Sequence, residues 1–202
     1  KRSGGIRADL SLQNLSGAKL SGINLQSAKL TGCKLIGASM ARGNFDHCDL
    51  FSANLQEADL TDASLIAADM RGICLRDAIL VRTNLQDSDL RQGTLLTASG
   101  DKDVGVIRSD LGRVDLSGAK AQRINLSGAN MSEATLVETD LTGANLTGVQ
   151  LNKANLQAAI LHGAILTGVD LSHTDLSGAD LRTADLRGAI VAGARFDDTD
   201  LE

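Results

Sequence analysis

Large apolar residues recur at every fifth position through most of this chain. One series runs from Leu10 to Leu95 without a slip, and a second runs from Leu111 to Leu201 in a register shifted by one. We call these residues centres. Two residues before most centres lies a small residue, usually Ala, and the residue between them is usually Asp or Asn. A period of five fits neither an α-helix nor a β-strand, so the chain must turn once in every five-residue unit.

This pattern predicts a square coil. If each unit forms one side, the centre and the small residue point inward and the other three residues point outward. Four units then close one coil of about twenty residues, and successive coils stack at the β-sheet spacing of about 4.8 Å, which gives roughly nine coils. Backbone groups of each coil pair with the coils on either side. The predicted structural core includes Leu60, Leu65, Leu141, Leu146, Ala58 and Ala144.

The composition fits a narrow aliphatic core. The 202 residues include no Pro, Trp or Tyr and only three Phe, and bulky aromatic rings would not fit beside stacked leucines. The 21 glycines are spread at regular intervals, as in the series Gly128, Gly148, Gly168. Such a series is typical of a turn that needs a positive φ, for example a type II turn.

The segments Ala58-Asp59-Leu60-Thr61-Asp62 and Ala144-Asn145-Leu146-Thr147-Gly148 resemble the pentapeptide-repeat family. The resemblance covers almost the whole chain and implies an all-β fold, a right-handed quadrilateral β-helix interrupted by one loop. We expect a single domain over residues 1–202, with a first repeat block at 6–97, a loop and register break at 98–108, and a second block at 109–202. The Leu-centred pattern is more similar to the cyanobacterial, plastid and BTB-associated members than to the topoisomerase-targeting resistance proteins. The former resemble interaction scaffolds.

The register break is one candidate interaction site. Sixteen residues separate Leu95 from Leu111, one more than three units, so a loop must leave the rod. Both a recognition element and a tolerated surface insertion are open interpretations. The candidate residues are Asp101, Lys102, Asp103, Arg108 and Arg113, the last two belonging to a basic cluster with Lys120 and Arg123.

One centre after the break is unusually small. Ala121 stands where Leu is expected, and an unfilled hole would cost stability. We expect the loop residue Val106 or Ile107 to fill this place.

Charge supplies a second candidate site. The net charge is −5, and residues 101–202 carry nine Lys and Arg against fifteen Asp and Glu. Asp140 and Asp180 share one predicted column, with Asp170 and Asp175 on neighbouring sides. A resemblance to the fluoroquinolone-resistance members therefore implies an alternative function, a DNA mimic that inhibits or protects a type II topoisomerase (gyrase) by presenting carboxylates in place of phosphates.

The topoisomerase-binding members differ from this chain in several ways. They resemble one another in having Phe at many centres, a strongly acidic surface and a dimerising C-terminal helix. Here Phe occupies only the centres Phe45 and Phe196, and Arg71, Arg76 and Arg91 interrupt the surface of the first half. The sequence therefore favours an interaction scaffold over DNA mimicry.

No pattern of catalytic, cofactor-binding or metal-ligating residues is found, so we expect neither an enzyme nor a bound cofactor. The histidines His47, His162 and His173 fall at separated outward positions. Cys33 and Cys48 occupy small inward positions, and Cys74 points outward as the one candidate for a reactive thiol. Three cysteines without a CxxC pair indicate reduced thiols.

The sequence thus favours a non-enzymatic scaffold or regulatory module that presents the outer faces of a rod and a mid-rod loop to an unidentified protein partner. No direct nucleic-acid binding is expected, and no apolar run is long enough to span a membrane. An uncovered solenoid end after Leu201 leaves an end-to-end homodimer as a further alternative. We therefore expect a soluble protein, of the cytoplasm in the first place. Because the chain begins at Lys1 and not at Met, a removed transit peptide would instead place it in the thylakoid lumen or plastid.

Overall fold

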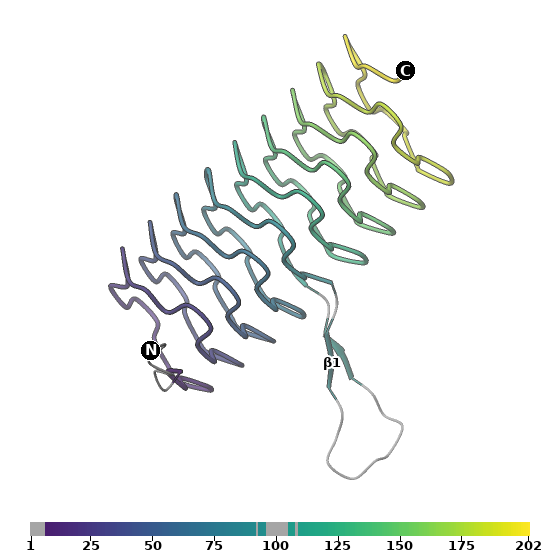
Figure 1. Cartoon of the computed structure of the whole chain (residues 1–202). Helices are drawn as coiled ribbons and strands as arrows, with labels where there is room; N and C mark the ends of the chain where they lie inside the picture. Colours follow the sequence, from purple (N-terminus) through teal and green to yellow (C-terminus); the bar gives the residue numbers. More distant parts are fainter. Residues whose placement is uncertain (1–6, 92, 96–104, 108) are drawn as a thin grey trace, which may run out of the picture.

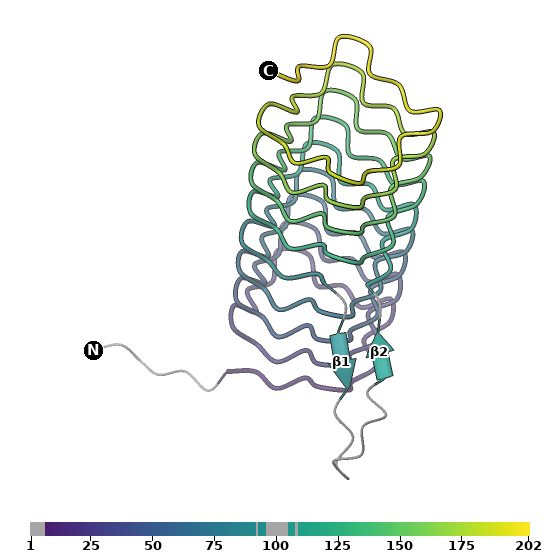
Figure 2. The same ribbon diagram turned by 90° about the vertical axis from the view of Figure 1, so that its right-hand side faces the viewer.

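The chain forms a rod of stacked square coils (Figures 1 and 2). The computed structural model describes residues 7–91, 93–95, 105–107 and 109–202. Parallel β-bridges link residues twenty apart, as in Asp9 with Lys29 and Lys29 with Asp49, so one coil takes twenty residues. The predicted right-handed quadrilateral β-helix is confirmed.

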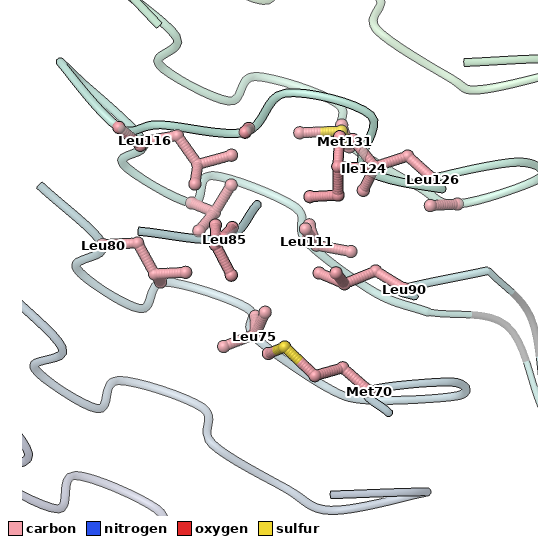
Figure 3. Packing of buried hydrophobic residues seen from close by; sticks show 14 of the residues in the cluster. Met70, Leu75, Leu80, Leu85, Leu90, Leu111, Leu116, Ile124, Leu126 and Met131 are labelled. Carbon is pink, nitrogen blue, oxygen red and sulfur yellow. The ribbon is translucent and has the colours of Figure 1, made fainter. Parts of the chain in front are cut away.

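Centres and small residues fill the inside of the rod. Leu60, Leu65, Leu146, Ala58 and Ala144 are completely buried, and Leu141 is 1% exposed. Centres of successive coils stack into four columns, part of which Figure 3 shows. Each column defines one face of the rod, named here by the two centres that flank the register break. Face 1 carries Leu90 and Leu126, face 2 Leu75 and Leu111, face 3 Leu80 and Leu116, and face 4 Leu85 and Ala121.

Units with Asp or Asn before the centre satisfy their five backbone N–H groups in a recurring way, as residues 53–57 illustrate. The N–H groups of Leu55 and Glu57 donate to carbonyls of the next coil, at 2.8 and 3.0 Å, and that of Asn54 donates to the previous coil at 2.8 Å. The N–H of Ala53 closes a turn onto the preceding centre at 3.0 Å. The remaining N–H, of Gln56, donates to the Asn54 side chain at 3.0 Å. Three of the five bonds therefore join coils, and the fifth depends on a side chain.

This fifth bond explains why Asp or Asn precedes most centres. Its Oδ1 accepts the N–H two residues later, as in Asn14 to Ser16, Asn84 to Gln86 and Asn155 to Gln157. A short polar side chain at this position thus replaces a backbone acceptor that the square coil cannot supply. The recurring Asp and Asn residues are structural before they are functional.

Replacing Asn54 by alanine is expected to lower the free energy of unfolding by about 1 kcal/mol, because the N–H of Gln56 loses its acceptor. Lys34, one coil earlier in the same column, is the matched control, since its side chain has no such bond among the described residues. Lys34→Ala should change the stability by less than about 0.5 kcal/mol. Chemical denaturation of the two variants measures the difference, and equal effects would contradict this role for Asn54.

Every turn places one residue in the left-handed region. Glycines such as Gly148 and Gly168 adopt a φ of 65° there, as the spacing predicts. Non-glycine residues occupy the same position in other units, among them Arg42, Arg82 and Arg123, with φ between 54 and 58°. The turn therefore favours glycine without requiring it.

A β-hairpin interrupts the rod between faces 1 and 2. Strand β1 (Gly93–Leu95) pairs antiparallel with β2 (Gly105–Ile107), and Thr94 lies opposite Val106. The coil before the hairpin pairs directly with the coil after it. Cys74 forms a β-bridge with Asp110, at a separation of 36 residues instead of twenty. The sixteen extra residues lie within one turn, and all four faces continue in the same order beyond them.

The prediction that Leu95 is the last centre of the first block is wrong. Leu95 belongs to β1, and the last centre before the break is Leu90. The regular bridges end at Asp89 and resume at Asp110, so the interruption begins earlier than the predicted 98–108 segment. An insertion of sixteen residues is one more than three units, which accounts for the shifted register of the second block.

The small centre Ala121 is completely buried. The same coil carries Val114 and Ile124 at two positions that hold small residues in most units, and both are buried. Figure 3 shows Ile124 beside Leu126 and Met131. Val114 and Ile124 are both larger than the alanine usual at these positions, so they add side-chain volume to the coil that lacks a leucine. The side chains of Val106 and Ile107, expected to fill this place, lie outside the described part of the structure.

Candidate functional site

The hairpin is the one feature of the described chain that departs from the repeat, and it projects from the side of the rod (Figures 1 and 2). Of the candidate residues assigned to this region, Asp101, Lys102, Asp103 and Arg108 lie outside the described residues. What the structure does describe is the two paired strands and the residues at which the hairpin leaves and re-enters the rod.

A buried hydroxyl joins the two feet of the hairpin. Ser109, which re-enters the rod at a small inward position, has no exposed surface. Its Oγ donates to the carbonyl of Arg91, the last described residue before β1, at 3.0 Å. The same Oγ accepts the N–H of Gly72, one coil below, at 3.1 Å. The side chain of Arg91 is fixed in turn by Asp89, with Nε 3.0 Å from Oδ2.

An ion pair fixes the residue after Ser109. Asp110 Oδ2 accepts two hydrogen bonds from Arg76 in the coil below, from Nη2 at 2.6 Å and from Nε at 3.0 Å. The two side chains are about one third exposed, at 36 and 29%. A partly screened ion pair contributes more to stability when, as here, two hydrogen bonds hold it in one geometry. The point at which the chain re-enters the rod is thus bound through both the Ser109 hydroxyl and the Asp110 carboxylate.

The predicted basic cluster does not form one surface. Arg113 is at a corner of face 2, whereas Lys120 and Arg123 lie on face 4. Arg113 pairs with Asp77 at 2.6 Å, and Arg123 pairs with Asp87 at 2.7 Å. These arginines tie one coil to the next across an exposed corner and are partly neutralised.

The predicted acidic residues are spread around the rod. Asp140 and Asp180 share the column on face 4, but Asp170 belongs to face 2 and Asp175 to face 3. Each of the four accepts the N–H two residues later in its own turn, at 2.9–3.0 Å. Their carboxylates therefore serve the local turn and do not converge on one side.

Arginines also neutralise part of this acidic half. Asp180 accepts bonds from Arg182 Nε at 2.9 Å and Nη2 at 2.7 Å, and Arg195 lies 3.2 Å from Asp175. Arg187 forms the same kind of pair with Asp185. Hydrogen bonds from the Arg182 side chain, then from its backbone N–H, hold the pKa of Asp180 at about 2.

Asp180 is expected to stay ionised in the folded protein until the pH falls to about 2. Because this pKa lies below the ordinary value of 3.8, the carboxylate stabilises the fold above about pH 4 and loses that contribution as the pH falls through about 2. Arg182→Ala should raise the pKa towards 3.8 while leaving the backbone donor in place. An NMR titration of the carboxyl carbon tests this, and an unchanged pKa in the variant would refute the assigned cause.

The histidines and cysteines of the described residues do not come together in a metal-binding cluster. His47, His162 and His173 are all exposed, but the first two belong to distant coils of face 4 and the third to face 2, and no group of three potential ligands comes together within the described ranges. Cys33 and Cys48 are buried, and burial raises the pKa of the Cys48 thiol to about 11. No helix in the described part of the chain is long and apolar enough to cross a membrane.

The sequence did not indicate the residues at the feet of the hairpin. Arg76 and Asp110 are 34 residues apart, and they meet only because faces 1–4 continue across the insertion. One signal was present. Omitting residues 92–107 restores the five-residue spacing between Leu90 and Leu111 and puts Ser109 and Asp110 at the small and bridge positions.

Comparison with known proteins supports this description of the fold. A family model of pentapeptide repeats matches residues 8–45, 44–80, 58–95, 109–148 and 164–202. Among solved structures, the chain is similar to HetL, a pentapeptide repeat protein involved in heterocyst differentiation regulation from the cyanobacterium Nostoc sp. strain PCC 7120. The two are 30% identical over 96% of this chain and 85% of HetL, with a TM-score of 0.75.

Two other solved structures are less similar. A pentapeptide repeat protein from the Arabidopsis thaliana thylakoid lumen is 28% identical over 46% of this chain and 68% of its own, with a TM-score of 0.30. QnrB1, a plasmid-mediated fluoroquinolone resistance protein, is 15% identical over 95% of this chain and 92% of its own, with a TM-score of 0.44. No curated protein matches the chain. With its repeats matched along most of its length, the chain belongs to the pentapeptide-repeat family.

Proposed function

We propose that this chain is a non-enzymatic interaction module, a scaffold or regulator that binds a protein partner through its mid-rod hairpin. One observation carries the proposal. The hairpin is inserted within a single turn, and the bridges from Cys74 to Asp110 and from Ile79 to Asp115 join the coils as if it were absent. Since the rod does not need the hairpin for its own pairing, its role lies outside the rod.

The outer faces offer a partner less than their charge suggests. Their Asp and Asn side chains accept turn N–H groups, and arginines such as Arg82 and Arg113 pair with Asp62 and Asp77 of adjoining coils. A partner that bound these groups would compete with bonds that hold the coils. The hairpin carries its own backbone pairing and is free of that competition.

Similarity to HetL supports a regulatory role, because that protein is involved in the regulation of heterocyst differentiation. DNA mimicry receives less support, since Asp140, Asp170, Asp175 and Asp180 lie on three faces and the last two have arginine partners.

Affinity capture followed by binding measurements on the purified partner tests the proposal. The intact chain should retain a partner that the chain lacking residues 92–107 does not bind. Equal binding by both chains would move the interaction to a flat face of the rod. Failure of the intact chain to bind any protein reproducibly would refute an interaction function.

A further inference from the structure

Asp110 connects three successive coils at the point where the hairpin re-enters the rod. Its Oδ1 accepts the N–H of Gly112 in its own turn at 3.1 Å and the side-chain amide of Asn130 in the coil above at 3.0 Å. Its Oδ2 accepts both bonds from Arg76 in the coil below. Asp110, where the chain re-enters the rod, is therefore fixed by the coil below, by the coil above and by its own turn.

Gly112 makes room for this arrangement. It occupies the first position of its turn, where φ is not positive, so the backbone conformation does not call for glycine. A Cβ at this position would lie 3.3 Å from both Arg76 Nη1 and Asp110 Oδ1. Residues at the equivalent position, such as Ser117 and Thr142, tolerate the carboxylate contact, so it is the guanidinium of Arg76 that a larger residue would press on. The glycine is thus explained by the ion pair beside it.

Ser109 extends the same set of contacts to Arg91, where the chain leaves the rod for the hairpin. Its bond to the Arg91 carbonyl holds the chain ends on the two sides of the hairpin together, and its bond from Gly72 holds both to the coil below. A serine at a small inward position does not by itself imply this role. Ser88, also buried at such a position, donates to the carbonyl of Leu85 within its own turn.

We propose that Ser109, Asp110, Arg76, Gly112 and Asn130 form a clamp that holds the hairpin in a fixed direction relative to the rod. The inference rests on the proposed function, in which the hairpin binds a protein partner. A hairpin already ordered by its feet loses less conformational entropy on binding than one that swings freely. A two-stranded hairpin has little stability of its own in water, so order must come from the rod.

Backbone ¹⁵N relaxation of Thr94 and Val106 tests the clamp in the full chain. In the wild-type protein, order parameters at these opposite residues should match the rod, at about 0.85. Ser109→Ala and Arg76→Ala should each lower them to below about 0.6. Two matched controls should leave them unchanged: Ser88→Ala, which removes another buried serine, and Arg113→Ala, which removes the Asp77 pair on the same face.

Low order parameters in the wild-type hairpin, or values that neither clamp variant changes, would overturn the proposal. If either substitution weakens the rod as a whole, Gly112→Ser provides a further test, because it displaces Arg76 without removing it. The measurement needs no partner and is independent of the binding experiment. A rigid hairpin without a partner would refute the proposed function alone, and hairpin-dependent binding by a mobile hairpin would refute the clamp alone.

Discussion

Leu146→Ala is expected to lower the free energy of unfolding by about 3 kcal/mol. Leu146 is completely buried in the column of face 1, with Leu126 below it and Leu166 above. Coils that are held by backbone bonds on both sides cannot close up around a missing side chain, so most of the cavity should remain. Chemical denaturation followed by far-ultraviolet circular dichroism measures the loss.

Leu186→Ala is the matched control. Leu186 belongs to the same face one coil beyond Leu166, is only partly buried, and has a described coil on one side only. In a solenoid each repeat is stabilised by its neighbours, so this change should cost about 1 kcal/mol. Equal losses in the two variants would show that burial between two coils is not what makes the centres important.

The sequence predicted the fold because the same five-residue pattern repeats many times on both sides of the interruption. Inward Leu and Ala positions follow from the spacing alone, since only a turn in every unit can bury both. The role of the Asp and Asn residues could not be read in this way. Their bonds to N–H groups two residues later depend on the turn geometry, which the pattern of apolar residues does not specify.

The start of the interruption was misplaced for a specific reason. Leu95 lies five residues after Leu90 and imitates a centre, although it belongs to β1. The contacts at the hairpin feet could not be predicted, because they join residues such as Arg76 and Asp110 whose proximity depends on which faces align beyond the insertion. The acidic residues Asp140, Asp170 and Asp175 could be assigned to columns, but their use in local turns became clear only from the hydrogen bonds.

Deleting residues 92–107 is expected to abolish partner binding while the rod remains folded. The deletion joins Arg91 to Arg108 and leaves Leu90 and Leu111 five residues apart, as in every regular unit. Arg108 would then take the turn position with positive φ, which Arg42 and Arg82 already occupy elsewhere in the rod. Removing a long loop also lowers the entropic cost of folding, so the variant should unfold at the same temperature as the wild type or higher.

Two further deletions separate loss of the hairpin from general damage. Removing residues 132–151 takes out one complete coil, keeps the register and the hairpin, and should leave binding intact because the seam joins equivalent positions on face 2. Removing residues 93–107 leaves Leu90 and Leu111 six residues apart, and this single extra residue should turn the inward side chains of the next unit outward and destabilise the rod. Circular dichroism and calorimetry report folding, and titration with the purified partner reports binding. If the 92–107 deletion unfolded as readily as the 93–107 deletion, the hairpin would be part of what holds the coils together, and the assignment of its role to a partner would fail.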